Sequence, residues 1–192
     1  MKRQKRMIEG ALGLALAGLL GLAQPVVAKE GPSGPDAAAV IKRDVENAVL
    51  GYSRCTVFDA VGVEVRDGVV TLRGSVKEPY RKNDIQSRVA RIAGVRAVRN
   101  EIAVQPLSFN DDRLRAELFR KIYGGDVLVN ASLADPPVRI VVTNGHVTLL
   151  GYVNSLVERQ QVGALARGTL AFGVDNQLRL ASERNGDRAS DS

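Results

Sequence analysis

The residues of this chain that could carry out acid–base or metal chemistry are few. His146 is the only histidine, so a catalytic triad or a histidine-based zinc site would lack its partners. His146 also precedes Val147 and Leu149 in an alternating run typical of a strand, and this predicts that its side chain faces solvent. We therefore expect no enzymatic activity, no metal site and no cofactor.

Two further features could in principle carry chemistry. Cys55 is the only cysteine and has no partner for an internal disulfide, so it either packs as a small half-buried residue or pairs between two chains. We favour packing and keep the intermolecular disulfide open as a hypothesis. Gly124-Gly125 lacks the lysine and the serine or threonine of a phosphate-binding loop, so we interpret it as a helix end and expect no small-molecule substrate.

Composition and charge give little support to nucleic-acid binding. The chain has 192 residues, of which 45% are hydrophobic, 25% charged and 4% aromatic, as in an ordinary globular protein. Residues 1–28 contribute +3 of the net charge of +6, so the remainder carries a modest +3. The outward residues Thr71, Arg73 and Ser75 of one expected strand offer no ring on which bases could stack. We expect no nucleic-acid partner.

The N-terminus has the layout of a secretory signal peptide. Basic residues at positions 2–6 precede an apolar run at about 10–23, which is shorter than the ~20 residues of a membrane span. Pro25 then breaks the helix, and Ala28 is a small residue of the kind found before a cleavage site. We expect export to the periplasm, cleavage after Ala28, and a flexible Gly/Pro-rich arm at 29–35.

An internal repeat organises the rest of the chain. The segment at 68–76 (GVVTLRGSV) matches the segment at 145–153 (GHVTLLGYV). The glycines that the two copies share are Gly68 and Gly74 in the first and Gly145 and Gly151 in the second. The two predicted domains are residues 36–105 and residues 110–181. A disordered polar tail is expected to follow at 182–192.

Each copy predicts the element order αββαβ. Apolar residues spaced by three and four predict an opening helix, and Asp67-Gly68 and Asn144-Gly145 predict two-residue hairpin turns. A second helix, at about 79–93 and 155–171, leads to a third strand. A helix that connects two strands of one sheet in a right-handed crossover makes those strands parallel, so we expect the third strand to run parallel to the second. The predicted class is α+β: two tandem modules, each a three-stranded mixed sheet with two helices on one face.

Several local details follow from glycine and acidic residues. Glycine inside a strand costs stability unless another backbone comes close, and we expect the crossing helix to be that neighbour of Gly74 and Gly151. Acidic residues can cap the opening helices, and the glycines that follow can adopt a left-handed C-cap. The predicted caps are Asp36 and Gly51 in the first copy, and Asp111 or Asp112 and Gly124 in the second.

Both copies carry a complete motif, Gly-x-Val-x-Leu-x-Gly-x-Val on the hairpin, then a helix, then a Val-x-Asn-x-(Ile/Leu) strand at 98–102 and 174–178. The chain thereby resembles tandem BON domain proteins, such as the osmotically inducible periplasmic protein family of Gram-negative bacteria. The resemblance implies binding to phospholipid membranes or envelope proteins, without catalysis. The chain departs from the lipoprotein members because no cysteine lies near the cleavage site.

The opening helix of the second copy is a candidate membrane surface. Its core stripe is flanked by basic and aromatic residues: Arg113, Phe119, Arg120, Lys121 and Tyr123. A basic helix with aromatics near its exposed edge can lie on an anionic lipid surface. The alternative is an ordinary amphipathic helix with a charged solvent face.

The outward face of the second sheet forms a second candidate surface. It carries Val141, Leu150 and Tyr152, whereas the first copy has Glu64 and Arg73 at the positions of Val141 and Leu150. This patch either packs between the two modules or binds a partner, and we favour packing.

The sequence thus predicts a periplasmic, monomeric protein of envelope maintenance or stress response. It would act through contact with anionic phospholipid or with envelope proteins. The alternatives are a chaperone-like module for exported proteins, acting through the patch of Val141, Leu150 and Tyr152, and a structural adaptor of an envelope complex.

Overall fold

A computed structural model describes residues 36–128 and 131–183 of the chain. The predicted signal peptide at 1–28, the arm at 29–35 and most of the tail lie outside the described residues. Among the described helices, none is long and apolar enough to cross a membrane.

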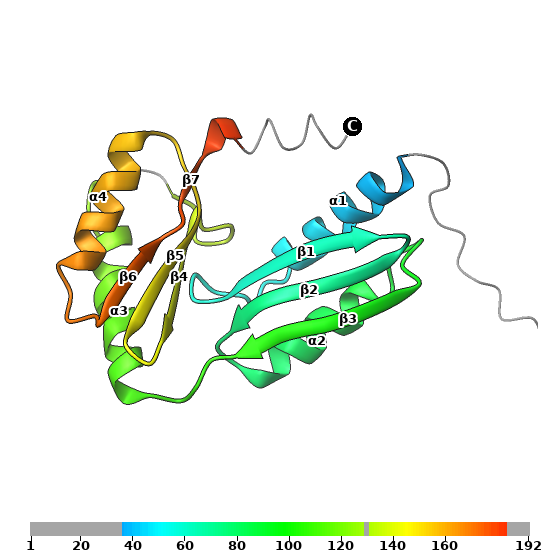
Figure 1. The fold of residues 1–192 in the computed structure, drawn as a ribbon, viewed down its shortest axis with the longest axis horizontal. Coiled ribbons are helices and arrows are strands. Elements are labelled where there is room, and N and C mark those ends of the chain that lie inside the picture. Colours follow the sequence, from blue (N-terminus) through cyan, green and yellow to red (C-terminus); the bar gives the residue numbers. More distant parts are fainter. Residues whose placement is uncertain (1–35, 129–130, 184–192) are drawn as a thin grey trace, which may run out of the picture.

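The first module has the predicted order αββαβ (Figure 1). β2 lies in the middle of its sheet, antiparallel to β1 and parallel to β3, with α1 and α2 on one face. Apolar residues of both helices and of the strands form one core, as expected for helices that cover a sheet. The elements are α1 (Ala37–Leu50), β1 (Ala60–Arg66), β2 (Val69–Val76), α2 (Pro79–Val89) and β3 (Ala97–Val104).

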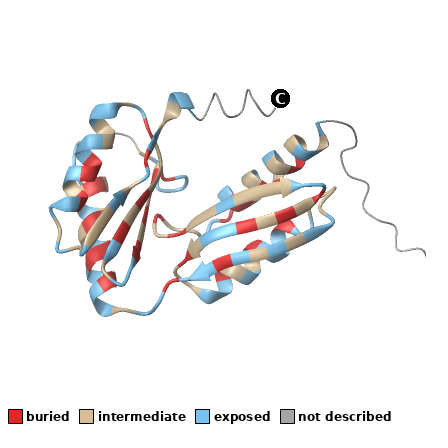
Figure 2. Ribbon diagram, in the orientation of Figure 1, coloured by how far each residue is buried: buried red, intermediate tan, exposed pale blue. Residues whose placement is uncertain are grey.

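The second module repeats this arrangement with one difference. Its third strand is split into two short pieces, β6 and β7, which both run parallel to β5. Figure 2 shows buried residues along the strands and along the helix surfaces that face them. The elements are α3 (Phe109–Tyr123), β4 (Val138–Thr143), β5 (His146–Val153), α4 (Leu156–Arg167), β6 (Gly173–Asn176) and β7 (Arg179–Leu180). The predicted fold class is confirmed.

The hairpin turns form as predicted. Asp67 and Gly68 have φ angles of 48° and 71°, and Asn144 and Gly145 have φ angles of 51° and 76°. Positive φ at both turn residues matches the right-handed twist of the strands that the turn joins. These turns set the register in which Arg66 pairs with Val69.

The prediction that Gly74 and Gly151 lie against the crossing helix is wrong. Their φ angles are 113° and 115°, and a Cβ atom there would lie 2.1 Å from the carbonyl oxygen of Ala60 or Pro137. The backbone that comes close is therefore the start of the neighbouring strand within the hairpin. No side chain fits beside that carbonyl, which explains the glycine in both copies.

Two predictions about the helix ends are also wrong. Gly51 and Gly124 have φ angles of −74° and −90°, so neither forms a left-handed cap. The N-cap of α3 is Ser108, whose hydroxyl accepts from the N–H of Asp111 at 3.2 Å. Asp36 occupies the N-cap position of α1 but makes no capping hydrogen bond through its side chain.

The asparagine of the third strand ties that strand to the second helix in both modules. Asn100 donates from its amide nitrogen to the carbonyl of Lys82 at 2.9 Å, and Asn176 donates to that of Arg159 at 3.0 Å. Each amide oxygen also accepts from the backbone N–H two residues further on, at 3.2 Å. An amide side chain both donates and accepts, which accounts for its place in the repeated motif.

Candidate functional site

The loop between α1 and β1 joins the two modules. Val57 from this loop is buried within the core of the second module, and its carbonyl accepts from the N–H of Ile140 in β4 at 2.8 Å. The ring of Phe58 lies 6.3 Å from that of Phe119 on α3. The first module therefore supplies part of the apolar core of the second.

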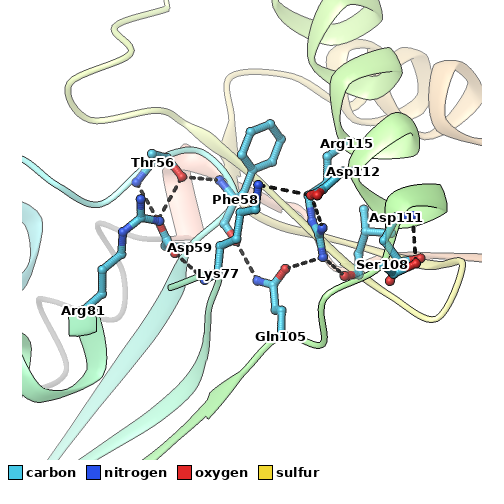
Figure 3. A network of polar contacts seen from close by, with 11 residues as sticks. Thr56, Phe58, Asp59, Lys77, Arg81, Gln105, Ser108, Asp111, Asp112 and Arg115 are labelled. Atoms are coloured by element: carbon cyan, nitrogen blue, oxygen red, sulfur yellow. Dashed lines mark hydrogen bonds and ion pairs between the residues drawn. The ribbon is translucent and has the colours of Figure 1, made fainter. Parts of the chain in front are cut away.

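A buried carboxylate holds this loop in place (Figure 3). Asp59 accepts hydrogen bonds from the N–H of Thr56 at 2.7 Å and from the N–H of Lys77 at 2.8 Å. Its third partner is the guanidinium of Arg81, at 2.6 Å. Asp59 and Arg81 are both buried, so the ion pair is shielded from water and fixes the loop that carries Val57.

A second buried pair crosses from the linker to α3 (Figure 3). Gln105 donates to the carbonyl of Phe58 at 2.8 Å and accepts from the guanidinium of Arg115 at 2.8 Å. Arg115 also bonds the carboxylate of Asp112 at 2.8 Å and donates to the carbonyl of Val142. Gln105 also donates to the hydroxyl of Ser75 in β2 at 3.2 Å, so these bonds connect the linker and the loop with both sheets, and the two modules form one unit.

An apolar groove of about 490 Å³ lies between the modules. Ala60 and Gly62 line it from the first module, and Val141 and Leu150 line it from the outward face of the second sheet. Tyr152 lies elsewhere, beside a separate small cavity, with the guanidinium of Arg179 5.7 Å from its ring. The predicted patch therefore divides, and only Val141 and Leu150 border the groove.

The aromatic residues of the predicted membrane surface are engaged within the protein. Phe119 stacks on Tyr123 with ring centroids 5.4 Å apart, and both rings are half-buried against the second core. The hydroxyl of Tyr123 accepts from the N–H of Val138 at 3.1 Å and donates to the carbonyl of the same residue. These rings therefore pack at the contact between the two modules, which we call the joint, and at the edge of β4. They are not exposed along the edge of the helix.

The basic residues of the same predicted surface differ from one another. Arg113 and Arg120 are exposed. Lys121 pairs with Glu117 at 2.9 Å and donates to the carbonyl of Gly168 at 2.8 Å, so it helps to hold α3 against the end of α4. Two cations of the predicted set thus remain on the surface of α3.

The sequence analysis missed a group of exposed apolar residues at the hairpin end of the second module, which we call the apolar tip. Leu107, Phe109, Leu170 and Phe172 are 92%, 79%, 85% and 82% exposed. The N–H of Phe172 donates to the carbonyl of Gly145 in the hairpin turn at 2.9 Å. The sequence marks these residues only by exclusion, because none of them fits the apolar period of the neighbouring helix or strand.

A buried carboxylate places the start of α3 beside the same turn. Asp111 accepts from the N–H groups of Asn144 and Gly145, each at 2.8 Å. Phe109 is two residues before Asp111, so the segments that carry Phe109 and Phe172 both border this turn. His146 lies there as well, exposed and with its ring 6.1 Å from that of Phe172.

The thiol of Cys55 lies on the groove and is half-buried. Burial, together with the negative charge of Asp59, raises the pKa of Cys55 to about 11. Since the thiolate is the nucleophile in alkylation and in disulfide exchange, the same burial slows the formation of a disulfide between chains.

We expect Cys55 to react with iodoacetamide at pH 8 about 100-fold more slowly in the folded protein than in urea, because the thiolate fraction falls tenfold for each unit of pKa. The measurement is the rate of mass increase in each condition. Equal rates would show that the thiol is exposed and ionised in the folded chain.

Two αββαβ modules, joined through a shared core and a buried polar network, define a tandem-domain protein. The sequence profile of the BON domain matches residues 37–106 and again residues 111–182. The chain therefore belongs to the BON domain family. This family is associated in general with membrane phospholipid binding, and its members are often periplasmic or membrane-associated.

Comparison with individual proteins adds less. No curated protein matches the chain. Among solved structures, CdsD, a structural protein of the type III secretion system of Chlamydia trachomatis, is 18% identical with a TM-score of 0.28, over 76% of this chain and 95% of that one. The C-terminal domain of CdsD is 16% identical with a TM-score of 0.27, over 78% of this chain and 99% of that domain.

Proposed function

We propose that this protein is a non-enzymatic periplasmic factor of envelope maintenance or stress response that binds anionic phospholipid surfaces through its second BON domain. The observation that carries the proposal is the apolar tip. Large exposed apolar side chains gathered at one end of a domain mark a surface that meets a membrane or another protein. The transfer of a phenylalanine or leucine side chain from water to the acyl boundary of a bilayer lowers the free energy.

The positive charges of the second domain support binding to an anionic membrane surface. Arg113 and Arg120 are exposed on α3, and Arg167 is exposed at the end of α4, just before the segment that carries Leu170. A cation close to an anionic bilayer contributes about 1 kcal/mol, and salt weakens this attraction. The apolar tip would enter the bilayer while these arginines meet the phosphate groups.

The groove favours a second candidate function, the binding of other exported proteins as a chaperone-like module or an adaptor. Val141 and Leu150 give the groove an apolar wall that a protein segment could cover. This function predicts binding in the absence of vesicles. Vesicle binding separates the two proposals.

We expect the chain from Lys29 onward to co-sediment with vesicles that contain phosphatidylglycerol and not with vesicles of phosphatidylcholine alone. The double substitution Phe109→Ser and Phe172→Ser should weaken binding at least about tenfold, because it removes two side chains that would enter the bilayer. The double substitution Arg113→Glu and Arg120→Glu should abolish the preference for anionic vesicles.

The matched control is Leu156→Ser, at the opposite end of α4 from Leu170. Leu156 is 58% exposed, so this variant removes a comparable apolar side chain away from the apolar tip. It should bind vesicles as the unchanged protein does. Binding to neither kind of vesicle, or an equal loss in the control, would reject the membrane proposal and leave protein partners as the function.

A further inference from the structure

The outer edge of β4 is closed by hydrogen bonds from other parts of the molecule. In an antiparallel pair, alternate residues of an edge strand point their backbone N–H and C=O groups away from the neighbouring strand. Along β4 each such residue has a partner outside the sheet. The partners are Tyr123 for Val138, Val57 for Ile140 and Arg115 for Val142.

β1 has the same place in the first module, but as far as the structure describes the chain, its outer edge is open. The hairpin closes on the pair of Arg66 and Val69, so Val61, Val63 and Val65 point their N–H and C=O groups away from β2. Within residues 36–128 and 131–183, no hydrogen bond reaches these outward groups. An edge of this kind is a template on which another strand can pair.

The burial of the side chains shows the same contrast. Val138, Ile140 and Val142 on β4 are each 0% exposed. The three valines at the matching positions of β1 remain partly exposed. Among the residues that the structure describes, the edge of β4 is therefore covered more fully than the edge of β1, at its side chains as well as at its backbone.

The difference arises from the helix beside each edge. The repeat aligns Tyr123 at the end of α3 with Leu50 at the end of α1. Leucine has no hydroxyl with which to bond the start of the strand, and Leu50 is 38% exposed. Within the described parts of the chain, no loop that corresponds to the segment of Val57 hydrogen-bonds to the first module at β1.

We propose that the edge of β1 binds an extended peptide segment of another protein as an added strand, one with apolar side chains at alternate positions. Its backbone pairs with Val61, Val63 and Val65. The groove begins at the end of β1 that holds Val61, so apolar side chains of the segment reach the wall formed by Val141 and Leu150. Backbone pairing gives affinity in this mode of recognition, and alternate side chains give specificity.

The chemistry of this partner is indicated by a contact that the protein already makes. Val57 pairs its carbonyl with the N–H of Ile140 and buries its side chain in the second core. An apolar residue from outside the module, held in a turn, thus closes part of the β4 edge. The groove is continuous with this joint, because Asp59 and Ala60 line it directly after that loop.

A lipid acyl chain fits this surface less well than a peptide does. An acyl chain could fill the groove, but it would cover the outward N–H and C=O groups of β1 without bonding them, which costs free energy. A second copy of the chain could pair its own β1 here. Both occupants are separated from a partner peptide by the experiment below.

The probe is a fluorescent, capped peptide of alternating valine and threonine, measured by fluorescence anisotropy with the chain from Lys29 onward. A second peptide carries N-methyl groups on alternate amides, so that its side chains are unchanged but its donors toward β1 are lost. We expect the first peptide to bind and the N-methylated peptide to bind at least about tenfold more weakly.

Two substitutions test the location. Leu50→Tyr places a hydroxyl beside the start of β1, where Tyr123 places one beside the start of β4. Val63→Pro removes one outward N–H that takes no part in the pairing with β2. Both should weaken peptide binding at least about tenfold while the circular dichroism spectrum is kept. If Val63→Pro does not fold, Leu50→Tyr and the N-methylated peptide decide. Leu156→Ser, far from β1, is the control and should bind normally.

The proposal is overturned by any of four results: no peptide binding, equal binding of both peptides, full displacement of the peptide by a fatty acid, or a dimer in sedimentation that Leu50→Tyr dissociates. The third assigns the groove to acyl chains and the fourth assigns the edge to a second copy. The β1 edge belongs to the first domain and the apolar tip to the second, so failure here leaves the vesicle experiment unaffected.

Discussion

Replacement of Gly74 by alanine is expected to lower the free energy of unfolding by about 3–5 kcal/mol, because two costs add at this residue. The φ angle of 113° is one that residues with a Cβ rarely adopt. The new Cβ would also lie 2.1 Å from the carbonyl oxygen of Ala60, which is backbone and cannot rotate away. Gly151→Ala should have the same effect, since its Cβ would meet the carbonyl oxygen of Pro137 at 2.1 Å.

Gly62→Ala is the matched control in the same hairpin. Gly62 lies in β1 without a positive φ, and the nearest atom to its Cβ position is 3.9 Å away. Alanine should therefore change stability by at most about 1 kcal/mol, and it can even stabilise the protein by restricting the unfolded chain. Urea unfolding followed by circular dichroism measures all three variants. A Gly74→Ala variant as stable as Gly62→Ala would show that the hairpin relaxes at little cost.

The sequence was sufficient for the parts of the fold that depend on local patterns. The alternation of valines, the Asp-Gly and Asn-Gly turns and the spacing of apolar helix residues predicted both modules and their element order. The wrong details depended on packing. Gly74 marked a close backbone contact, but the sequence could not tell the helix from the neighbouring strand. The cap of α3 is Ser108 because Asp111 bonds the distant hairpin turn instead.

The candidate surfaces were harder to predict, because they depend on how the modules meet. Phe119 and Tyr123 flank the core stripe of α3, and only the loop that carries Phe58 decides that Phe119 is covered. Leu107 and Phe172 show the reverse. Nothing local marks them as exposed, since a short apolar segment between elements packs or projects according to its neighbours. The open edge of β1 became visible only by comparison with the closed edge of β4.

Arg115→Met is expected to lower the free energy of unfolding by about 2–3 kcal/mol and to separate the unfolding of the two modules. Methionine has nearly the length of arginine but leaves the buried side-chain oxygen of Gln105 and the carbonyl of Val142 without their donor. One gain offsets part of this loss. The Nε of Arg115 is buried without a hydrogen-bond partner, and the variant no longer buries it.

Calorimetry distinguishes the joint from the modules themselves. If the bonds of Arg115 couple the modules, the unchanged protein unfolds in one transition and Arg115→Met in two. Arg113→Met is the control: it removes an exposed guanidinium on the same helix and should shift stability by no more than about 0.5 kcal/mol. A single transition that moves to lower temperature would mean that Val57 and Phe58 hold the modules together without the polar network. The groove would then keep its shape in the variant, and peptide binding at β1 would survive the loss of Arg115.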